Sequence, residues 1–116
     1  MAEETMSPEL VQCIEDCTVC HRTCLDVINY CLEMGEEHVA PEHMKLLKDC
    51  AEICQTALNF MLSDSEFIAE ICQACADVAE ACAESCAEYD DEHMMACANI
   101  CRKTAESCRQ MAKAHV

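Results

Sequence analysis

Cysteines recur along this chain at steps of three and four residues, and this spacing limits the fold more than any other feature. The densest stretch, CIEDCTVCHRTC, begins at Cys13 and ends at Cys24, with thiols at steps of four, three and four residues. Side chains that are three and four residues apart lie on one face of an α-helix. The spacing therefore predicts a helix whose thiols form one stripe facing the protein interior.

Capping residues bound the first two predicted helices. Ser7 and Pro8 supply an N-cap and a first-turn proline, and the apolar stripe that follows stops at Gly35. A second helix opens at Pro41 and ends near Leu62, and its stripe again contains cysteines. These two helices are joined by a short connection, which makes them antiparallel neighbours.

Two more helices are expected in the second half of the chain. Ser63 and Glu66 have the spacing of a capping box, and heptads of apolar residues then continue to Tyr89. The acids of residues 90–92 suit the positive end of a fourth helix. No stretch shows strand alternation. The expected fold class is all-α: an antiparallel up-down-up-down four-helix bundle with a cysteine-lined core, with residues 1–116 forming a single domain.

The composition indicates that sulfur has a function beyond packing. The chain has 14 Cys and 8 Met, but only four Phe and Tyr residues and no Trp. A buried Cys packs as a small hydrophobe, and replacing Leu or Ile by Cys loses apolar area worth ~25 cal/mol per Å². Stability alone therefore does not explain so many cysteines.

Metal chemistry explains the thiols better than disulfides do. Thiols on one helix face, with helix axes about 8–10 Å apart, suit few pairs to disulfide geometry. Structural zinc sites usually take Cys-x-x-Cys pairs from turns, and iron–sulfur proteins take clustered cysteines from loops. Thiolate and thioether ligands select copper(I). The pairs here are mostly Cys-x-x-x-Cys, at Cys13/Cys17, Cys20/Cys24, Cys50/Cys54, Cys82/Cys86 and Cys97/Cys101.

The net charge limits the possible binding partners, and the N-terminal sequence indicates the cellular compartment. The formal net charge of −16 argues against nucleic-acid binding, because the chain could release few counterions from phosphates. No run of about 18 apolar residues occurs, so no membrane insertion is expected. The acidic start carries no leader, which predicts a cytoplasmic protein, although an exported chain after leader removal would read the same way. Cytosolic thiols stay reduced, which favours metal or redox chemistry.

The antiparallel topology gives the two ends of the bundle different chemistry. Thioether and imidazole groups bind copper(I) without losing a proton, so residues of this kind could receive arriving ions. Those expected at one end are Met34, His38, His43, Met44, His93, Met94 and Met95. An apolar plug is expected at the other end, from Leu10, Val11, Phe60, Met61, Leu62, Phe67, Ile68 and Met111. His21 and His115 are expected to be surface residues.

A helical bundle with Cys-x-x-x-Cys pairs on every helix and no leader resembles the cytosolic copper storage proteins. The resemblance covers the whole chain and implies storage of multiple Cu(I) ions inside the bundle, with assembly of bundles into homotetramers. Ala79 and Thr104 interrupt the stripes. The thiol ligands that the resemblance implies are Cys13, Cys17, Cys20, Cys24, Cys31, Cys50, Cys54, Cys72, Cys75, Cys82, Cys86, Cys97, Cys101 and Cys108.

Two other functions stay open at the level of sequence. One is a store for zinc or for heavy metals in general. The other is a thiol redox enzyme, which would need an exposed cysteine of low pKa with a nearby base. Only His21 adjoins a thiol in sequence, and it lies one step off the stripe. We therefore expect a non-enzymatic copper(I) store.

Overall fold

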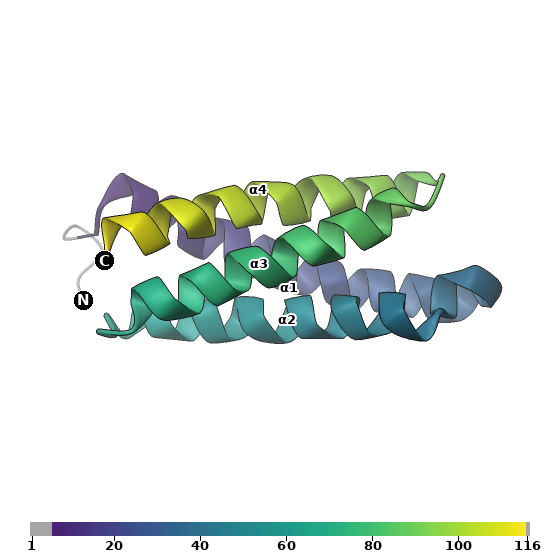
Figure 1. The fold of residues 1–116 in the computed structure, drawn as a ribbon, viewed down its shortest axis with the longest axis horizontal. Coiled ribbons are helices and arrows are strands. Elements are labelled where there is room, and N and C mark those ends of the chain that lie inside the picture. The colour runs from purple at the N-terminus through teal and green to yellow at the C-terminus, as the bar shows by residue number, and fades with distance from the viewer. Residues whose placement is uncertain (1–5, 116) are drawn as a thin grey trace.

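The computed structural model describes residues 6–115, and within that range it contains helices and no strand. The elements are α1 (Pro8–Met34), the short 3-10 helix η2 (Glu36–Val39), α2 (Pro41–Leu62), α3 (Ile68–Ala87) and α4 (Glu92–Ala114). The four α-helices lie side by side in a rod with extents of 46 × 21 × 18 Å (Figure 1). The antiparallel four-helix bundle predicted from the sequence is confirmed.

Helix caps form at three of the expected places. The Ser7 hydroxyl accepts a hydrogen bond from the Leu10 N–H at 3.1 Å, and the Asp91 carboxylate accepts one from the Met94 N–H at 2.8 Å. Gly35 ends α1 with a φ of +68°, a backbone conformation that only glycine adopts without strain. Its N–H donates to the Cys31 carbonyl at 2.9 Å.

The expected capping box before α3 is wrong. Ser63 ends α2 instead, and its N–H donates to the Asn59 carbonyl at 3.1 Å. Asp64 then takes a left-handed conformation, with a φ of +55°, which reverses the chain. Because residues 63–67 are used for this turn, α3 begins only at Ile68, and Glu66 has no helix N-terminus to cap.

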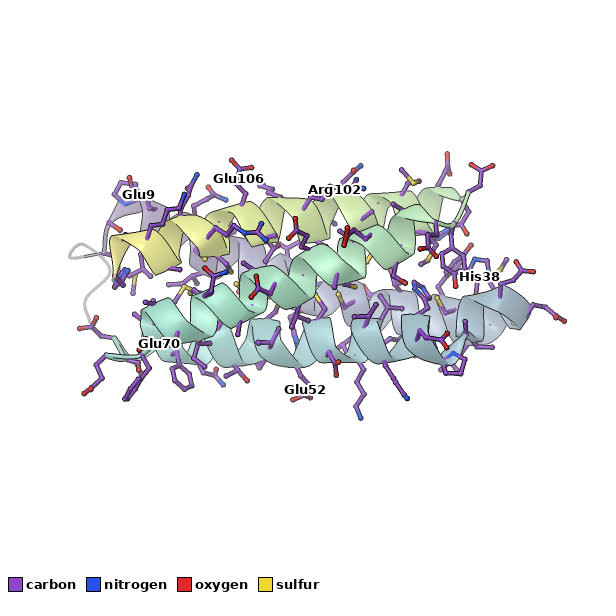
Figure 2. All side chains as sticks on the ribbon, in the orientation of Figure 1. Glu9, His38, Glu52, Glu70, Arg102 and Glu106 are labelled. Carbon is purple, nitrogen blue, oxygen red and sulfur yellow. The ribbon has the colours of Figure 1, made fainter. Side chains whose placement is uncertain are left out.

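Cysteine side chains line the core of the bundle along its length. All 14 cysteine side chains are fully buried and free, and in Figure 2 sulfur atoms lie between the helices. The remaining large buried side chains are few, and Leu47 and Met94 are examples. Both loops that join α1 to α2 and α3 to α4 lie at one end of the rod, which we call the mouth; we call the other the far end (Figure 1).

The far end is closed by a smaller apolar layer than the sequence suggested. Leu10, Met61, Ile68 and Met111 are buried there. Val11, Leu62 and Phe67 are instead 37%, 48% and 51% exposed. Val11 and Leu62 each follow a core residue by one position, so they lie about 100° around the helix and outside the core.

A buried polar contact between α1 and α4 explains one gap in the stripes. Thr104 donates from its hydroxyl to the Asp16 carbonyl at 3.3 Å, so a hydroxyl here links two helices where a thiol could have lain. The Asp16 carboxylate is also buried, and it accepts hydrogen bonds from Gln12 and Ser107 and lies 3.6 Å from the Lys103 ammonium.

No described helix is long and apolar enough to cross a membrane.

Candidate metal centre

Four thiols from three helices meet near the middle of the bundle. The sulfur atoms of Cys20 and Cys24 on α1, Cys50 on α2 and Cys101 on α4 all lie within 4.8 Å of one another. Cys20 Sγ lies 3.7 Å from Cys50 Sγ and 3.9 Å from Cys101 Sγ. We call these four residues the central group. Its sulfurs are close enough for one soft cation to contact two or three of them.

Two further groups lie between the central group and the far end, and they share Cys17. The first joins Cys17 to Cys13 and Cys108, with Sγ–Sγ distances to Cys108 of 3.6 and 3.7 Å. The second joins Cys17 to Cys54 and Cys75, which are 3.8 Å apart. A shared thiol allows neighbouring ions to be bridged by sulfur.

The other thiols continue the line in both directions. Cys97 Sγ lies 4.0 Å from Cys101 Sγ on the mouth side of the central group. Towards the far end, a hydrogen bond with Cys108 lowers the pKa of Cys72, but the bond with Cys13 and burial outweigh it and raise this pKa to about 12. Cys82 and Cys86 of α3 are likewise fully buried.

Hydrogen bonds within the central group shift the pKa values of its thiols in opposite directions. Hydrogen bonds from Cys101 and Cys24 lower the pKa of Cys20 to about 6, whereas bonds with Cys101 and Cys20 raise the pKa of Cys24. A thiolate at Cys20 is therefore stabilised by neighbouring S–H groups. A soft cation that bound here would take the place of those protons, so its binding would release them to solvent.

Three different soft donors meet at the mouth. Cys31 Sγ lies 3.7 Å from His43 Nε2 and 3.9 Å from Met94 Sδ, and all three side chains are buried. Burial lowers the pKa of His43, which favours the neutral imidazole. Burial, followed by the charges of Asp91 and Cys97, raises the pKa of Cys31 to about 11. We call Cys31, His43 and Met94 the mouth group.

Hydrogen bonds hold the mouth group in place. The other imidazole nitrogen of His43, Nδ1, is hydrogen-bonded to the Ser85 hydroxyl of α3 at 2.7 Å. Such a bond fixes the orientation of the ring and leaves Nε2 directed at Cys31. Ser85 therefore orients the one buried imidazole among the described residues.

A set of aromatic and imidazole rings, which we call the ring collar, contacts the mouth group through Tyr89. The Tyr89 ring lies 4.5 Å from that of His43 and 4.8 Å from that of His38, measured between centroids. His38 Nε2 is hydrogen-bonded to Asp91 at 2.8 Å, and it lies at this end of the bundle in Figure 2. The His93 ring stacks on Tyr30 with centroids 4.1 Å apart.

The structure separates the methionines and histidines that the sequence grouped together. His43 and Met94 contact Cys31, whereas Met34 and Met95 are 51% and 40% exposed. Met34 lines a surface pocket of about 550 Å³ together with acidic residues and Tyr89. Met44 is half-buried against the core, and His38 and His93 belong to the ring collar.

Sequence analysis missed some residues and misplaced one. No pattern pointed to Ser85 or Tyr30, because their partners are far away in sequence. His21 is not a plain surface residue: it is half-buried, and its Nδ1 is hydrogen-bonded to the Ala51 carbonyl at 2.7 Å. His115 is exposed, as expected, and its Nδ1 lies 3.0 Å from the Met111 carbonyl.

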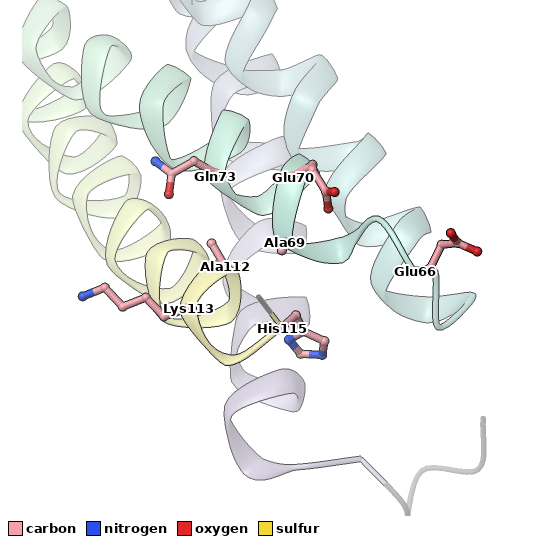
Figure 3. Close-up of a pocket in the computed structure, with 7 residues that line it drawn as sticks. All are labelled: Glu66, Ala69, Glu70, Gln73, Ala112, Lys113 and His115. Atoms are coloured by element: carbon pink, nitrogen blue, oxygen red, sulfur yellow. The ribbon is translucent and has the colours of Figure 1, made fainter.

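A larger surface pocket, of about 670 Å³, lies at the far end between α3 and α4. Figure 3 shows its lining residues, among them Glu66, Glu70, Lys113 and His115. The Lys113 ammonium and the Glu66 carboxylate lie on opposite sides of the view, so these charged groups do not converge on one point. No cysteine lines this pocket, and the thiol line remains the candidate site.

Comparison with known families identifies the thiol-lined bundle. A sequence model described as copper storage protein matches residues 6–113 of the chain. The chain belongs to the copper storage protein family. Among curated proteins of similar sequence is an uncharacterized cysteine-rich protein, YhjQ, from Bacillus subtilis (strain 168). It is 42% identical over 81 residues, which cover 70% of this chain and 75% of that protein.

Solved structures of copper storage proteins share the whole bundle. The Cu(I)-bound copper storage protein BsCsp3 is 40% identical over 90% of this chain and 98% of its own, with a TM-score of 0.85. The copper storage protein Ccsp from Streptomyces lividans, loaded with 10 copper equivalents, is 27% identical over 90% of this chain and 84% of its own, with a TM-score of 0.80. A Nitrosospira multiformis protein is 48% identical over 91% of this chain and 96% of its own, with a TM-score of 0.87.

Proposed function

We propose that this chain stores copper(I) ions inside its bundle by binding them to cysteine thiolates. The observation that carries the proposal is the central group, in which four buried thiols from three helices lie within 4.8 Å of one another. Thiolates are soft ligands, and copper(I) accepts the two or three that such a group offers to each ion. Membership of the copper storage family and the Cu(I)-bound relative BsCsp3 support this assignment.

The store takes several ions, and all of its cysteines serve as ligands. Cys17 belongs to two of the thiol groups, so one sulfur can bridge two ions. Bridging also reduces the negative charge that each copper(I) leaves buried without compensation. The proposed ligands are Cys13, Cys17, Cys20, Cys24, Cys31, Cys50, Cys54, Cys72, Cys75, Cys82, Cys86, Cys97, Cys101 and Cys108.

Ions are received at the mouth. The mouth group offers a thiol, an imidazole and a thioether at the end of the thiol line, next to Cys97, whose charge raises the pKa of Cys31. Exposed thioethers and the collar imidazoles lie further out and form weaker first contacts. The proposed receiving ligands are Met34, His38, His43, Met44, His93, Met94 and Met95.

The protein acts as a store and not as an enzyme. A catalytic cysteine needs solvent access, and all 14 cysteines here are fully buried. Residues 1–116 form one storage unit, and copies assemble into a homo-oligomer, a tetramer by family resemblance. Storage takes place in the cytosol, as for the Streptomyces lividans relative described as a cytosolic copper storage protein.

A direct competition between metals tests the proposal. Reduced, metal-free protein is incubated anaerobically with equal excesses of copper(I) and zinc(II), separated from free metal and analysed for both elements. We expect copper to be retained in large excess over zinc, because copper(I) is the softer cation and accepts two or three thiolates, whereas zinc requires a tetrahedral set of four ligands at each site. Retention of mainly zinc, at a few ions per chain, would contradict the proposal.

A substitution at Ser85 tests whether copper(I) ions pass His43 when they enter at the mouth. Ser85→Ala removes the hydrogen bond to His43 Nδ1, so the ring loses its fixed tautomer and orientation. We expect copper(I) loading to slow by ~10-fold, the scale on which such outer partners act, with unchanged final capacity. Stopped-flow absorbance measures the rate, and ¹⁵N NMR of the metal-free protein reports the tautomer of His43.

Ser85→Thr is the matched control, since it keeps the hydroxyl. It should preserve the tautomer and the loading rate. A change in the His43 tautomer without any change in loading would show that ions do not pass His43.

A further inference from the structure

Two positions that face the thiol line carry no sulfur, Ala79 of α3 and Thr104 of α4. Each stands where the repeat of three and four residues would place a cysteine, and the cysteines on either side of it in sequence are seven residues apart. Both side chains are buried in the core. The line of sulfur atoms is therefore interrupted on two of the four helices.

The register between α3 and α4 brings the two interruptions to one level of the bundle. The two helices are antiparallel neighbours (Figure 1). The thiol of Cys75 is hydrogen-bonded to that of Cys108, and the thiol of Cys82 to that of Cys101. Each sulfur-free position lies four residues from the first of these pairs and three from the second, so the two positions lie side by side between them. We call this level the sulfur gap.

Neither residue at the sulfur gap is suited to hold copper(I). Ala79 has no donor atom. The Thr104 hydroxyl is turned towards the backbone, 2.9 Å from the Ile100 carbonyl and 3.3 Å from the Asp16 carbonyl, and thiolates bind copper(I) in preference to oxygen. Seven helical residues rise ~10.5 Å, whereas metal–thiolate bonds of about 2.3 Å let one ion join sulfurs only ~4.6 Å apart. An ion therefore cannot cross the gap along α3 and α4 by contacting sulfur on both sides at once.

Cys54 of α2 provides sulfur at the same level of the bundle. Its Sγ lies 3.8 Å from that of Cys75, and the two form one group with Cys17. Hydrogen bonds with Cys17, Cys20, Cys50 and Cys75 raise the pKa of Cys54. Cys20 and Cys50 belong to the central group, on the mouth side of the gap. Cys54 thus contacts thiols on both sides of the sulfur gap.

We propose that Cys54 is the transfer residue that carries copper(I) across the sulfur gap. It links the central group to the thiols nearer the far end, which we call the far thiols. The gap residues favour this path because they withhold sulfur from α3 and α4. The inference rests on the proposed function and deepens it, since it divides the store into two compartments. The far thiols are Cys13, Cys17, Cys72, Cys75 and Cys108.

Each transfer is a ligand exchange without a change of oxidation state. A bond from copper to the Cys54 sulfur forms while a bond to a thiolate of the central group breaks. The proton of the Cys54 thiol passes to the sulfur that the ion leaves. The exchange with Cys17 or Cys75 follows in the same way, and the ion remains copper(I) throughout.

The time course of loading tests the proposal. Reduced, metal-free full chain is mixed anaerobically with excess copper(I), stopped-flow absorbance follows the copper–thiolate bands, and native mass spectrometry counts the ions per chain at intermediate times. We expect two phases in the wild-type protein, a fast one on the mouth side of the gap and a slow one as ions reach the far thiols. Cys54→Ala should slow the second phase at least ~10-fold, because the remaining sulfurs are further apart.

Cys72→Ala is the matched control. Cys72 is another fully buried cysteine, and its thiol is hydrogen-bonded to Cys108 and Cys13, which are both far thiols. Both substitutions remove one ligand, so both should lower the final capacity by a similar amount. Only Cys54→Ala should change the rate of the slow phase. Circular dichroism of the metal-free variants shows that each is folded.

Thr104→Cys in the Cys54→Ala background tests the role of the gap itself. It places sulfur midway between Cys101 and Cys108 and should restore at least half of the lost rate, which a merely structural role of Cys54 would not predict. Thr104→Val, of the same size but without sulfur, should give no rescue. A wild-type protein that fills completely in a single phase would overturn the proposal and leave copper storage intact. So would equal slow phases in Cys54→Ala and Cys72→Ala, or rescue by Thr104→Val as large as by Thr104→Cys. A wild-type protein that binds no copper(I) would instead contradict the proposed function, and the inference with it.

Discussion

Anaerobic titration of the reduced protein with copper(I) is expected to saturate above seven ions per chain. If each ion held two private thiolates, the 14 cysteines would hold seven. The structure places Cys17 in two thiol groups and brings the central group within 4.8 Å, so sulfurs can be shared and the number of ions rises. Substituting alanine at Cys20, Cys24, Cys50 and Cys101 should lower the capacity by about a third or more, because bridges to neighbouring ions are lost as well.

Val27→Ala is the control for this variant. Val27 is buried on the same stripe of α1 but carries no sulfur, so its truncation lowers the free energy of unfolding by ~1–3 kcal/mol and leaves the capacity unchanged. Elemental analysis after gel filtration measures the bound copper in each variant, and circular dichroism checks folding. Saturation at three or four ions, with a tetrahedral spectrum after cobalt substitution, would indicate zinc-type sites instead.

Removing the thioethers of the mouth is expected to slow copper exchange without changing how much copper is held. Met34, Met44, Met94 and Met95 are replaced together by Leu, which keeps volume and apolar character at a cost below ~1.5 kcal/mol each. Loading, and removal by a competing chelator, should both slow by ~10-fold because the first soft ligands are gone. Met94 should account for most of the effect, since its Sδ lies 3.9 Å from Cys31 Sγ while Met34 and Met95 point to solvent.

A variant with Phe60→Leu and Phe67→Leu at the far end provides the comparison. Neither residue belongs to the buried core, so exchange rates should match those of the wild-type protein. Stopped-flow absorbance follows both directions of transfer. If the far-end variant alters exchange and the mouth variant does not, ions pass through the far end or between helices, and the proposed direction is wrong.

The helices could be predicted from the sequence because their signals are local. Ser7, Gly35 and Asp91 act within one turn of their own position, and the stripe of cysteines follows from helical geometry alone. The capping box at Ser63 failed because the same residue types also serve turns. Local sequence did not show that Asp64 would reverse the chain.

The candidate site was predictable in its ligand types and less so in its geometry. Steps of three and four residues along the sequence show that Cys20 and Cys24 lie on one face of the helix. Which thiols of the other helices they contact depends on the register in which the helices pack. The bond from His43 to Ser85 joins residues 42 positions apart, and that from Thr104 to Asp16 joins residues 88 apart. Such pairs depend on the axial register between the packed helices, and no local sequence pattern encodes this register.

The buried apolar layer of Leu10, Met61, Ile68 and Met111 covers the thiol line at the far end. If ions enter and leave only at the mouth, as proposed, a copper ion held near Cys13 returns to the mouth past sulfurs that later ions occupy. The protein would then behave as a last-in, first-out stack, in which recent copper is quickly returned and early copper is kept in reserve. One folded chain could thus hold a fast and a slow pool of the same metal with the same ligand chemistry, separated only by depth.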